Sequence, residues 1–306
     1  MVRLSRNKKL VTAVLLTRNS EKYVRDNIGS LVNDGRRSGV PLEIIVVDGG
    51  STDSTLGILK DLSRDLANLE VIALKKNMGT TMSRNLAIRK SRGEYIFVLD
   101  SDTVVLPGAI NGLIDALESN SRIGLAAPKL IYPNGEVQIS CKKFPTLINK
   151  LAKFLPIKFL NDLGQRAETY PECIYSRNNE NTPVAHCISA AWMLKREAIN
   201  DVGFLDESIF YAPEDVDYCA RLWLSGWQVI YVPMVSVVHY TQRLSHRRLD
   251  MAWLHIKGLF YYFRKYKYLF SPKSLLYQIR RVASAYGVSP PIETCCESSF
   301  CGEKHK

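Results

Sequence analysis

The stretch Tyr95-Ile-Phe-Val-Leu-Asp-Ser-Asp102 carries the strongest structural signal in this chain. Its five consecutive apolar residues predict a buried strand. Two carboxylates, Asp100 and Asp102, follow at once, and hard oxygen donors at the end of a strand suit Mg²⁺ or Mn²⁺. Acidic residues after strands are also common turn formers that hydrogen-bond their own backbone, so this stretch alone leaves both interpretations open.

Short apolar, β-branched runs alternate with amphipathic segments before this stretch. Strands are predicted at Val11 to Leu16, Glu43 to Val47, Val71 to Leu74 and Tyr95 to Leu99. Apolar residues at helical spacing predict helices between them, the third over about Thr81 to Ser91. This alternation predicts an α/β fold with a Rossmann-like, mostly parallel central sheet flanked by helices.

Polar residues follow three of the predicted strands, at Thr17 to Asn19, Asp48 to Asp53 and Asp100 to Asp102. They are candidate ligand contacts, because ligands bind outside the carboxyl ends of the strands in such sheets. No topology is predicted from Ile131 to Thr182, where prolines interrupt the periodicity. The elements predicted after this gap are a strand over Ala185 to Leu194, a helix over Asp215 to Leu224, and extended segments at Val229 to Val232 and Val235 to His239.

The composition of the 306 residues, 46% hydrophobic and 23% charged, is that of a globular protein. A formal net charge of +11 suits nucleic acid, an anionic membrane surface or phosphate-bearing substrates, and charge alone does not choose among them. Seven cysteines without a regular framework favour a reducing, cytoplasmic compartment.

Neither a signal peptide nor a membrane-spanning helix is predicted. The apolar run Leu10 to Thr17 follows basic residues but continues directly into Arg18-Asn19 without a cleavage site, so it is interpreted as a strand. No window approaches the roughly 20 apolar residues that a spanning helix needs. Any membrane contact is therefore expected to be peripheral.

A second acidic cluster, Glu214-Asp215-Val-Asp217, lies where a helix is predicted to begin. Carboxylates in a first turn complement the helix dipole, and Asp217 is placed to pair with Arg221 four residues later. Asp215 is left without such an explanation. His239 ends an apolar run, where a lone histidine is more often a hydrogen-bonded core or edge residue than a metal ligand.

Four blocks, taken in order, resemble the family 2 glycosyltransferases of the GT-A fold, and the resemblance covers about Val11 to His246. The last block looks like the acceptor-side helix of rhamnosyltransferase-like and galactofuranosyltransferase-like members. No Gln-x-x-Arg-Trp motif follows it, which argues against a processive synthase. The blocks are Val11 to Tyr23, Ile44 to Asp53, Asn77 to Ala87 with Gly93 to Asp102, and Glu214 to His239.

This resemblance implies an inverting, metal-dependent transfer of a sugar. Asp215 is then the catalytic base, and Asp102 and His239 hold Mn²⁺ or Mg²⁺. Glu214 and Trp192 are expected at the acceptor and sugar cleft, although a tryptophan in an apolar run is equally a core residue. The residues expected around the nucleotide are Thr17, Arg18, Asn19, Asp48, Asn77, Gly79, Arg84, Asp100 and Ser101.

The partners implied are a nucleoside diphosphate sugar, either dTDP-rhamnose or a UDP-hexose, and a glycan or lipid-linked acceptor. No nucleic acid is expected, and the protein is placed in the cytoplasm, at or near the inner face of the cell membrane. Three alternatives predict different behaviour: a metal-dependent phosphatase or nucleotidyltransferase, a nucleic-acid-binding protein whose affinity falls steeply with salt, and an inactive relative.

The expected division is a transferase domain over residues 1–246, with a nucleotide half at about 10–105 and an acceptor half at about 106–246. A basic, aromatic helical extension follows over 247–290, with Trp253, Ile256, Phe260 and Phe263 at helical spacing. It either lies at an anionic membrane or packs on the domain. Residues 291–306 are predicted to be a disordered tail rather than a zinc site built from Cys295, Cys296, Cys301 and His305.

Overall fold

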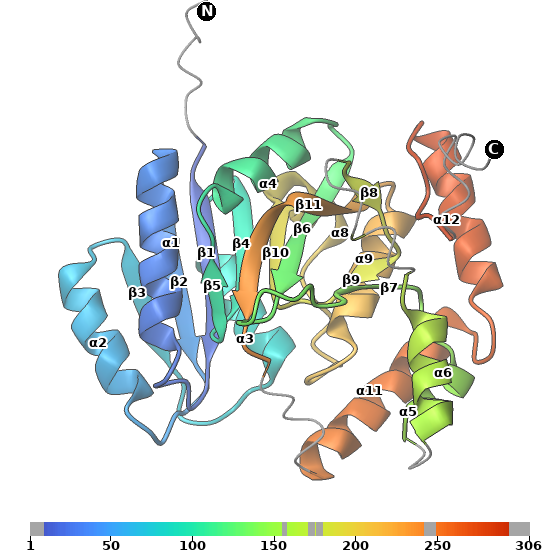
Figure 1. The fold of residues 1–306 in the computed structure, drawn as a ribbon, viewed down its shortest axis with the longest axis horizontal. Helices are drawn as coiled ribbons and strands as arrows, with labels where there is room; N and C mark the ends of the chain where they lie inside the picture. The colour runs from blue at the N-terminus through green and yellow to red at the C-terminus, as the bar shows by residue number, and fades with distance from the viewer. Residues whose placement is uncertain (1–8, 155–157, 171–174, 176–179, 242–248, 294–306) are drawn as a thin grey trace, which may run out of the picture.

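The N-terminal half is a parallel sheet covered by helices, as predicted (Figure 1). A computed structural model describes residues 9–154, 158–170, 175, 180–241 and 249–293. Its first strands run in the order β3-β2-β1-β4 and are all parallel to their neighbours. These strands and the helices between them are β1 Val11–Thr17, α1 Val24–Ser38, β2 Leu42–Asp48, α2 Thr55–Asp65, β3 Leu69–Ala73, α3 Thr80–Lys90 and β4 Tyr95–Asp100.

The sheet continues beyond β4 with strands of mixed direction, giving nine described strands in all. β10 is antiparallel to both β4 and β6, whereas β11 is parallel to β6. Two short strands, β5 and β8, complete it along β11. The bounds are β5 Thr103–Val105, β6 Ile123–Ile131, β8 Thr182–Pro183, β10 Ala191–Lys195 and β11 Gln228–His239.

Two predicted strands in the later part of the sheet need correction. The strand expected over Ala185 to Leu194 is broken into β9 His186–Cys187 and β10, because β9 leaves the sheet to pair with β7 Cys141–Lys142. The two extended segments expected up to His239 form one strand, β11, whose register shifts between Val232 and Ser236. A β-bulge of this kind bends a strand without ending it.

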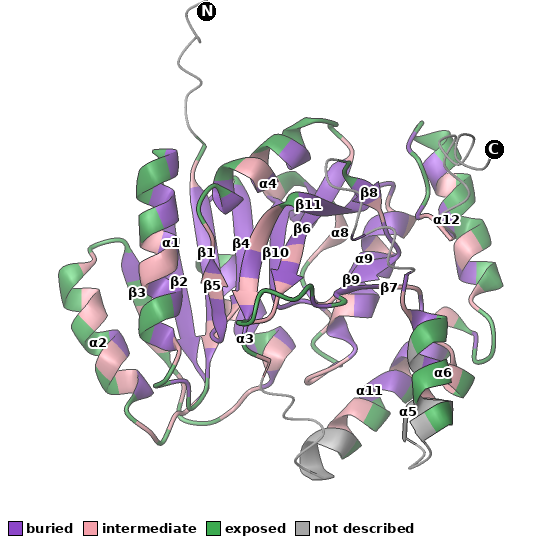
Figure 2. Cartoon of the chain, viewed as in Figure 1, coloured by how far each residue is buried: buried purple, intermediate pink, exposed green. Residues whose placement is uncertain are grey.

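Helices cover both faces of the sheet, so most residues of its central strands are buried (Figure 2). The edge strand β3 is largely half-buried or exposed. Alternate residues of β1 enter different cores: Val14 packs with Ala87 of α3, whereas Leu15 packs with Ile28 of α1. The predicted helix at Asp215 is α9 Glu214–Leu224. Four further helices are α4 Ala109–Glu118, α5 Leu147–Phe154, α6 Lys158–Glu168 and α8 Arg196–Val202.

The predicted C-terminal extension consists of α11 Leu249–Tyr266 and α12 Lys273–Ala285. One face of α11 packs on the rest of the chain and buries Leu259, Tyr262 and Phe263. Of the residues predicted at helical spacing, Phe263 therefore packs on the domain, while Trp253 and Phe260 are 57% and 71% exposed.

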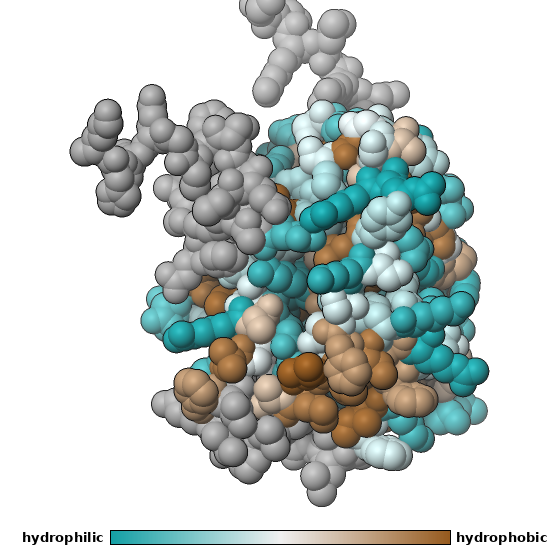
Figure 3. All heavy atoms as spheres, turned by 90° about the vertical axis from the view of Figure 1, so that its right-hand side faces the viewer, coloured by the Kyte–Doolittle hydropathy of each residue, from teal (hydrophilic) through white to brown (hydrophobic). Residues whose placement is uncertain are grey.

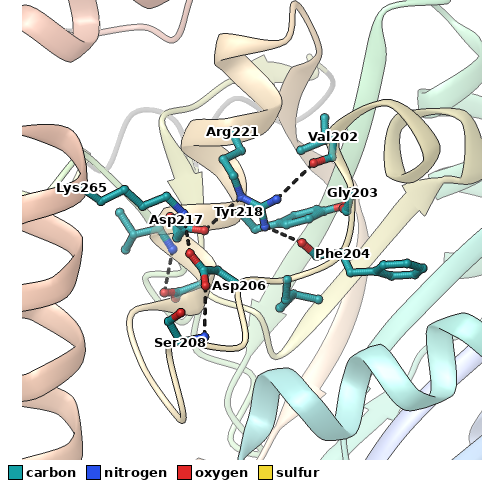
Figure 4. A network of polar contacts seen from close by, with 12 residues as sticks. Val202, Gly203, Phe204, Asp206, Ser208, Asp217, Tyr218, Arg221 and Lys265 are labelled. Atoms are coloured by element: carbon teal, nitrogen blue, oxygen red, sulfur yellow. Dashed lines mark hydrogen bonds and ion pairs between the residues drawn. The ribbon is translucent and has the colours of Figure 1, made fainter.

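Charged residues fix α11 against the loop that leads into α9 (Figure 4). Lys265 Nζ lies 2.7 Å from carboxylate oxygens of both Asp206 and Asp217. The predicted pair between Asp217 and Arg221 is present at 3.0 Å, but Asp217 is buried rather than on the surface. At Gly258 the backbone of α11 approaches so closely that a Cβ would lie 1.9 Å from the Ala212 carbonyl oxygen.

No helix in the described part of the chain is long and apolar enough to cross a membrane. The alternative zinc ligands Cys295, Cys296, Cys301 and His305, together with most of the predicted tail, lie outside the described residues.

Candidate active site

A pocket of 450 Å³ opens at the carboxyl ends of β1 and β4, where the sequence predicted ligand contacts. We call it the strand-end pocket. Its lining brings together nine predicted site residues: Thr17, Arg18, Asn19, Asn77, Gly79, Asp100, Ser101, Asp102 and His239. The β1, β4 and β11 ends and the loop before α3 therefore converge on one cavity.

Asp48 lies behind the wall of this pocket. Its side chain is buried and accepts hydrogen bonds from the hydroxyls of Thr17 (3.0 Å) and Ser51 (2.5 Å). Ser51 in turn accepts a hydrogen bond from the backbone N–H of Asn19 at 2.9 Å. Asp48 thus holds the Thr17 and Asn19 loops together, and its predicted contact with a nucleotide stays a prediction.

Three potential metal ligands meet at the floor of the strand-end pocket. Ligand atoms of Asp100, Asp102 and His239 all lie within 4.8 Å of one another. β4 carries Asp100, Asp102 follows it in the turn to β5, and β11 ends at His239 beside β5. The pairing of β5 with β11 explains how residues so far apart in sequence become neighbours.

The hydrogen bonds around His239 leave one ring nitrogen directed at Asp102. Gln138 donates through Nε2 to the hydroxyl of Thr241 (3.2 Å), so its Oε1 accepts from His239 Nδ1 at 2.9 Å. In the neutral imidazole, His239 Nε2 then carries a lone pair, and it lies 3.6 Å from Asp102 Oδ1. Two electron-rich acceptors this close favour a cation between them, so these residues fit a divalent metal.

Arg84 joins the carboxylates of two different elements. Its buried guanidinium donates to Asp100 Oδ1 at 2.9 Å and to Glu214 Oε1 at 3.0 Å. It also donates to the carbonyl of Ser189 at 3.1 Å. Arg84 does not line the strand-end pocket, so the structure supports a positioning role, and its predicted contact with the nucleotide stays a prediction.

A second pocket of 240 Å³ lies on the α9 side of Arg84. We call it the basic pocket. Its lining includes Lys142, Lys150, His186, Glu214, Asp215 and His255. The two pockets share Thr80, Asp100, Tyr211 and His239, so each opens onto the metal-ligand cluster.

Burial raises the pKa of both carboxyls at the start of α9. The pKa of Glu214 rises to about 7 through burial and then repulsion from Asp215, against the attraction of Arg84. The pKa of Asp215 also rises because of burial, and Lys142 opposes this most strongly. Glu214 is held by Arg84 and Ser189, whereas among the described residues Asp215 bonds only locally, its Oδ1 accepting from the N–H of Val216 at 2.8 Å. Asp215 is therefore the carboxylate better placed to meet a ligand.

Gly79 lines the strand-end pocket, whereas Trp192, expected either at the sugar cleft or in the core, does not. Gly79 adopts φ 87°, and a Cβ there would lie 2.4 Å from the carbonyl oxygen of Phe210, so the close approach is to backbone. Trp192 is buried on β10, stacks on Tyr218, and lines neither pocket. Trp192 therefore lies in the core. The sequence could not show this, because an apolar run around a tryptophan fits a core and a cleft equally well.

Sequence reasoning missed Gln138 and Lys142, which belong to the stretch without a predicted topology. Gln138 orients the predicted ligand His239, and Lys142 lines the basic pocket beside Asp215. Neither belongs to a recognisable motif. Only the pairing of β7 with β9 and the approach of Gln138 to β11 reveal them.

A family model described as glycosyl transferase family 2 matches residues 12–203, more than half of the chain. The chain belongs to this family. Its sheet and flanking helices are those of the GT-A fold, and transferase chemistry is favoured over phosphatase, nucleotidyltransferase or nucleic-acid binding. Among curated relatives, an N-acetylglucosaminyl-diphospho-decaprenol L-rhamnosyltransferase of Mycobacterium tuberculosis is 27% identical over 223 residues, covering 68% of this chain and 69% of the relative.

Two solved structures are similar in fold. A mannosyltransferase from Pyrobaculum calidifontis, in complex with GDP-Man and Mn²⁺, has a TM-score of 0.58 at 17% identity and covers 91% of this chain and 74% of its own. GalNAc-T7 with UDP, GalNAc and Mn²⁺ has a TM-score of 0.60 at 14% identity over 76% of this chain. This chain spans only 43% of the length of GalNAc-T7.

Proposed function

We propose that this protein transfers a sugar from a nucleoside diphosphate to a glycan or lipid-linked acceptor, with inversion at the anomeric carbon. The observation that carries the proposal is the position of Asp100, Asp102 and His239 where the two pockets meet. A donor diphosphate in the strand-end pocket and an acceptor hydroxyl in the basic pocket would meet at this junction.

Asp102 and His239 would hold the metal, with Asp100 contacting the ribose or a metal-bound water. When bound, a divalent cation supplies positive charge that stabilises the leaving diphosphate. A mixed carboxylate and imidazole set accepts Mn²⁺ readily, whereas Mg²⁺ prefers oxygen ligands and retained waters. Both ions remain candidates, and Mn²⁺ in two structures of similar fold supports the proposal.

Asp215 removes the proton from the attacking hydroxyl. It lines the basic pocket at the start of α9, opposite the strand ends that would hold the donor. Its raised pKa increases its basicity, and a carboxylate that remains ionised accepts the proton more readily as a result. Arg84 bridges Asp100 and Glu214, so it keeps the α9 start in register with the strand-end pocket.

The donor we propose is dTDP-rhamnose or a UDP-hexose. The rhamnosyltransferase relative supports the first, and the uridine nucleotide in GalNAc-T7 supports the second. A lipid-linked acceptor accords with the diphospho-decaprenol in the name of the relative, and synthesis of a cell-envelope polysaccharide would be its setting.

We also propose a peripheral contact with the inner face of the cell membrane. Apolar side chains gather on the lower part of the face in Figure 3, where Figure 1 places α5, α6 and α11. Phe260, Leu269 and Phe270 line a groove there with Arg264 and Lys267, a combination that suits an anionic lipid surface. The same helix carries His255 into the basic pocket, so a docked membrane would lie near the acceptor site.

Vesicle flotation tests this contact. Replacing Trp253 and Phe260 with serine should weaken binding to phosphatidylglycerol vesicles at least about tenfold, because burial of each ring contributes about 1.5–3 kcal/mol. Tyr277→Ser is the matched control, since Tyr277 is an exposed aromatic on α12. Equal vesicle binding by all variants would contradict the membrane contact.

A nucleotide-sugar screen tests the proposed function. Thermal stabilisation should require both a nucleoside diphosphate sugar and Mn²⁺ or Mg²⁺, and Asp102→Asn should remove the effect of the metal. Two results would contradict the assignment of the donor site: a metal effect on stability that persists in Asp102→Asn, or no stabilisation of the wild-type protein by any nucleotide sugar.

A further inference from the structure

The basic pocket contains an ammonium group that the proposed chemistry does not use. Lys142 lies on β7, opposite His186 in the antiparallel β7-β9 pair, and its side chain lines the pocket together with Asp215. Within the described residues, Lys142 Nζ makes no hydrogen bond or ion pair. Burial and the nearby charge of Lys150 lower the pKa of Lys142, so its present environment does not satisfy the charge.

The surroundings of Lys142 concentrate positive charge. Lys150 reaches the same pocket from α5 and is anchored at 3.2 Å by the buried Glu168. The imidazoles of His186 and His255 also line the pocket, one from β9 and the other from α11. Four separate elements thus direct cationic or hydrogen-bonding groups at one small space.

Tuning of Asp215 does not account for this arrangement by itself. Lys142 attracts Asp215 and opposes the rise in its pKa, but no ion pair joins the two side chains. A lysine that served only to keep Asp215 ionised would be expected to contact it directly, as Lys265 contacts Asp217 elsewhere in the protein. The gap beside Lys142 instead leaves room for a ligand with its own negative charge.

We propose that Lys142, supported by Lys150, binds a phosphate group of the acceptor and so places the acceptor hydroxyl against Asp215. This inference rests on the proposed function and adds to it the chemical class of the acceptor. Lysine is a suitable partner, because it binds phosphate as a point charge and its flexible stem needs no bidentate geometry. A neutral glycan would add no negative charge beside the ammonium of Lys142, whose attraction to Asp215 and Glu168 does not prevent its pKa from being lowered.

Calorimetric titration of the full chain with inorganic phosphate tests the site, with the strand-end pocket first saturated with Mg²⁺ and the nucleoside diphosphate that stabilises the protein. Lys142→Gln should weaken phosphate binding about tenfold or more, because a charge-assisted bond is lost. Lys142→Arg should retain it. Lys143→Gln is the matched control, since Lys143 is the next residue and does not line the pocket.

Several outcomes would overturn the inference: no phosphate binding by wild-type protein, equal binding by Lys142→Gln, equal weakening by Lys143→Gln, or acetate binding as tightly as phosphate. Equal phosphate binding by Lys142→Gln together with an altered pH dependence of sugar transfer would show that Lys142 modulates Asp215 instead. Hydrolysis of the donor without acceptor tests the proposed function separately, so failure of one is distinguishable from failure of the other.

Discussion

The two pockets of this protein differ in chemistry and in how the chain builds them. The strand-end pocket is lined by hydroxyl, amide and carboxylate oxygens that follow neighbouring strands of one sheet. The basic pocket gathers lysines and histidines from β7, α5, β9 and α11, which belong to three distant segments of the chain. One fold thus places a site suited to a metal and a nucleotide next to a site suited to an anion, with Arg84 between them.

The largest expected effect concerns the basic pocket alone. Asp215→Asn should lower the rate of sugar transfer by about 10²–10⁴-fold, because removal of a general base has this cost. Donor affinity, measured by calorimetry, should stay unchanged since Asp215 does not line the strand-end pocket. Equal loss of donor binding and transfer would show that the two pockets do not divide the work in this way.

A smaller effect is expected when the strand-end pocket is altered indirectly. Gln138→Leu removes the hydrogen bond that orients His239, and we expect Mn²⁺ affinity to fall about 10–100-fold. Electron paramagnetic resonance of Mn²⁺ measures the affinity. Gln228→Leu, the same substitution at the other end of β11, is the control and should bind Mn²⁺ normally. Normal affinity in Gln138→Leu would remove Gln138 from the metal site.

The contacts that hold α11 against α9 and the loop before it should contribute to the free energy of unfolding. Lys265→Met leaves the buried Asp217 with Arg221 but without its second cation, at a cost of about 2 kcal/mol in the free energy of unfolding. Urea denaturation measures this quantity. Lys257→Met on the same helix is the control, because Lys257 is exposed. An unchanged unfolding midpoint for Lys265→Met would show that this network contributes little.

The acidic carboxyls at the start of α9 predict a distinct response to pH. Asp215 must be ionised to accept a proton and its folded pKa lies above the ordinary 3.8, so transfer should decline about tenfold per pH unit as pH falls below that folded pKa. A rate that is flat down to pH 4 would contradict the raised pKa.

Glu214 should make the stability of the fold depend on pH, and stability should fall as pH rises. Its pKa is raised from 4.5 to about 7 in the folded protein, so between these values the folded state holds a proton that the unfolded state has lost. The contribution of Glu214 to stability is therefore present at low pH and lost as pH rises through this window. Thermal melting of wild type and Glu214→Gln across the same range should show the variant losing less stability as pH increases.

The strand-end pocket could largely be predicted from the sequence. Each parallel strand and the helix after it are encoded locally, so apolar periodicity located β1 to β4 and therefore their polar ends. The acidic turn after β4, taken alone, was equally consistent with a metal-binding site and with a simple turn. Resemblance to a family supplied the pairing of Asp102 with His239, and the structure brings these residues together through β5 and β11.

The basic pocket and the hydrogen bonding of His239 could not be predicted to the same extent. The bond between Gln138 and His239 spans 101 positions, and Lys142 reaches the pocket through a two-residue strand that has no periodic signal. Trp192 is buried in the core, and its apolar sequence surroundings fit a core residue and a cleft residue equally well. Such contacts depend on tertiary packing between distant segments, and local sequence patterns do not encode them.

The most direct test of the central claim is hydrolysis of the nucleotide sugar that stabilises the protein, measured as nucleoside diphosphate release with Mn²⁺ and after metal removal by chelation. We predict that wild-type protein releases the nucleoside diphosphate only with metal, and that Asp102→Asn releases it in neither condition. Release that persists after chelation, or in Asp102→Asn with Mn²⁺, would contradict a metal-dependent donor site at Asp100, Asp102 and His239.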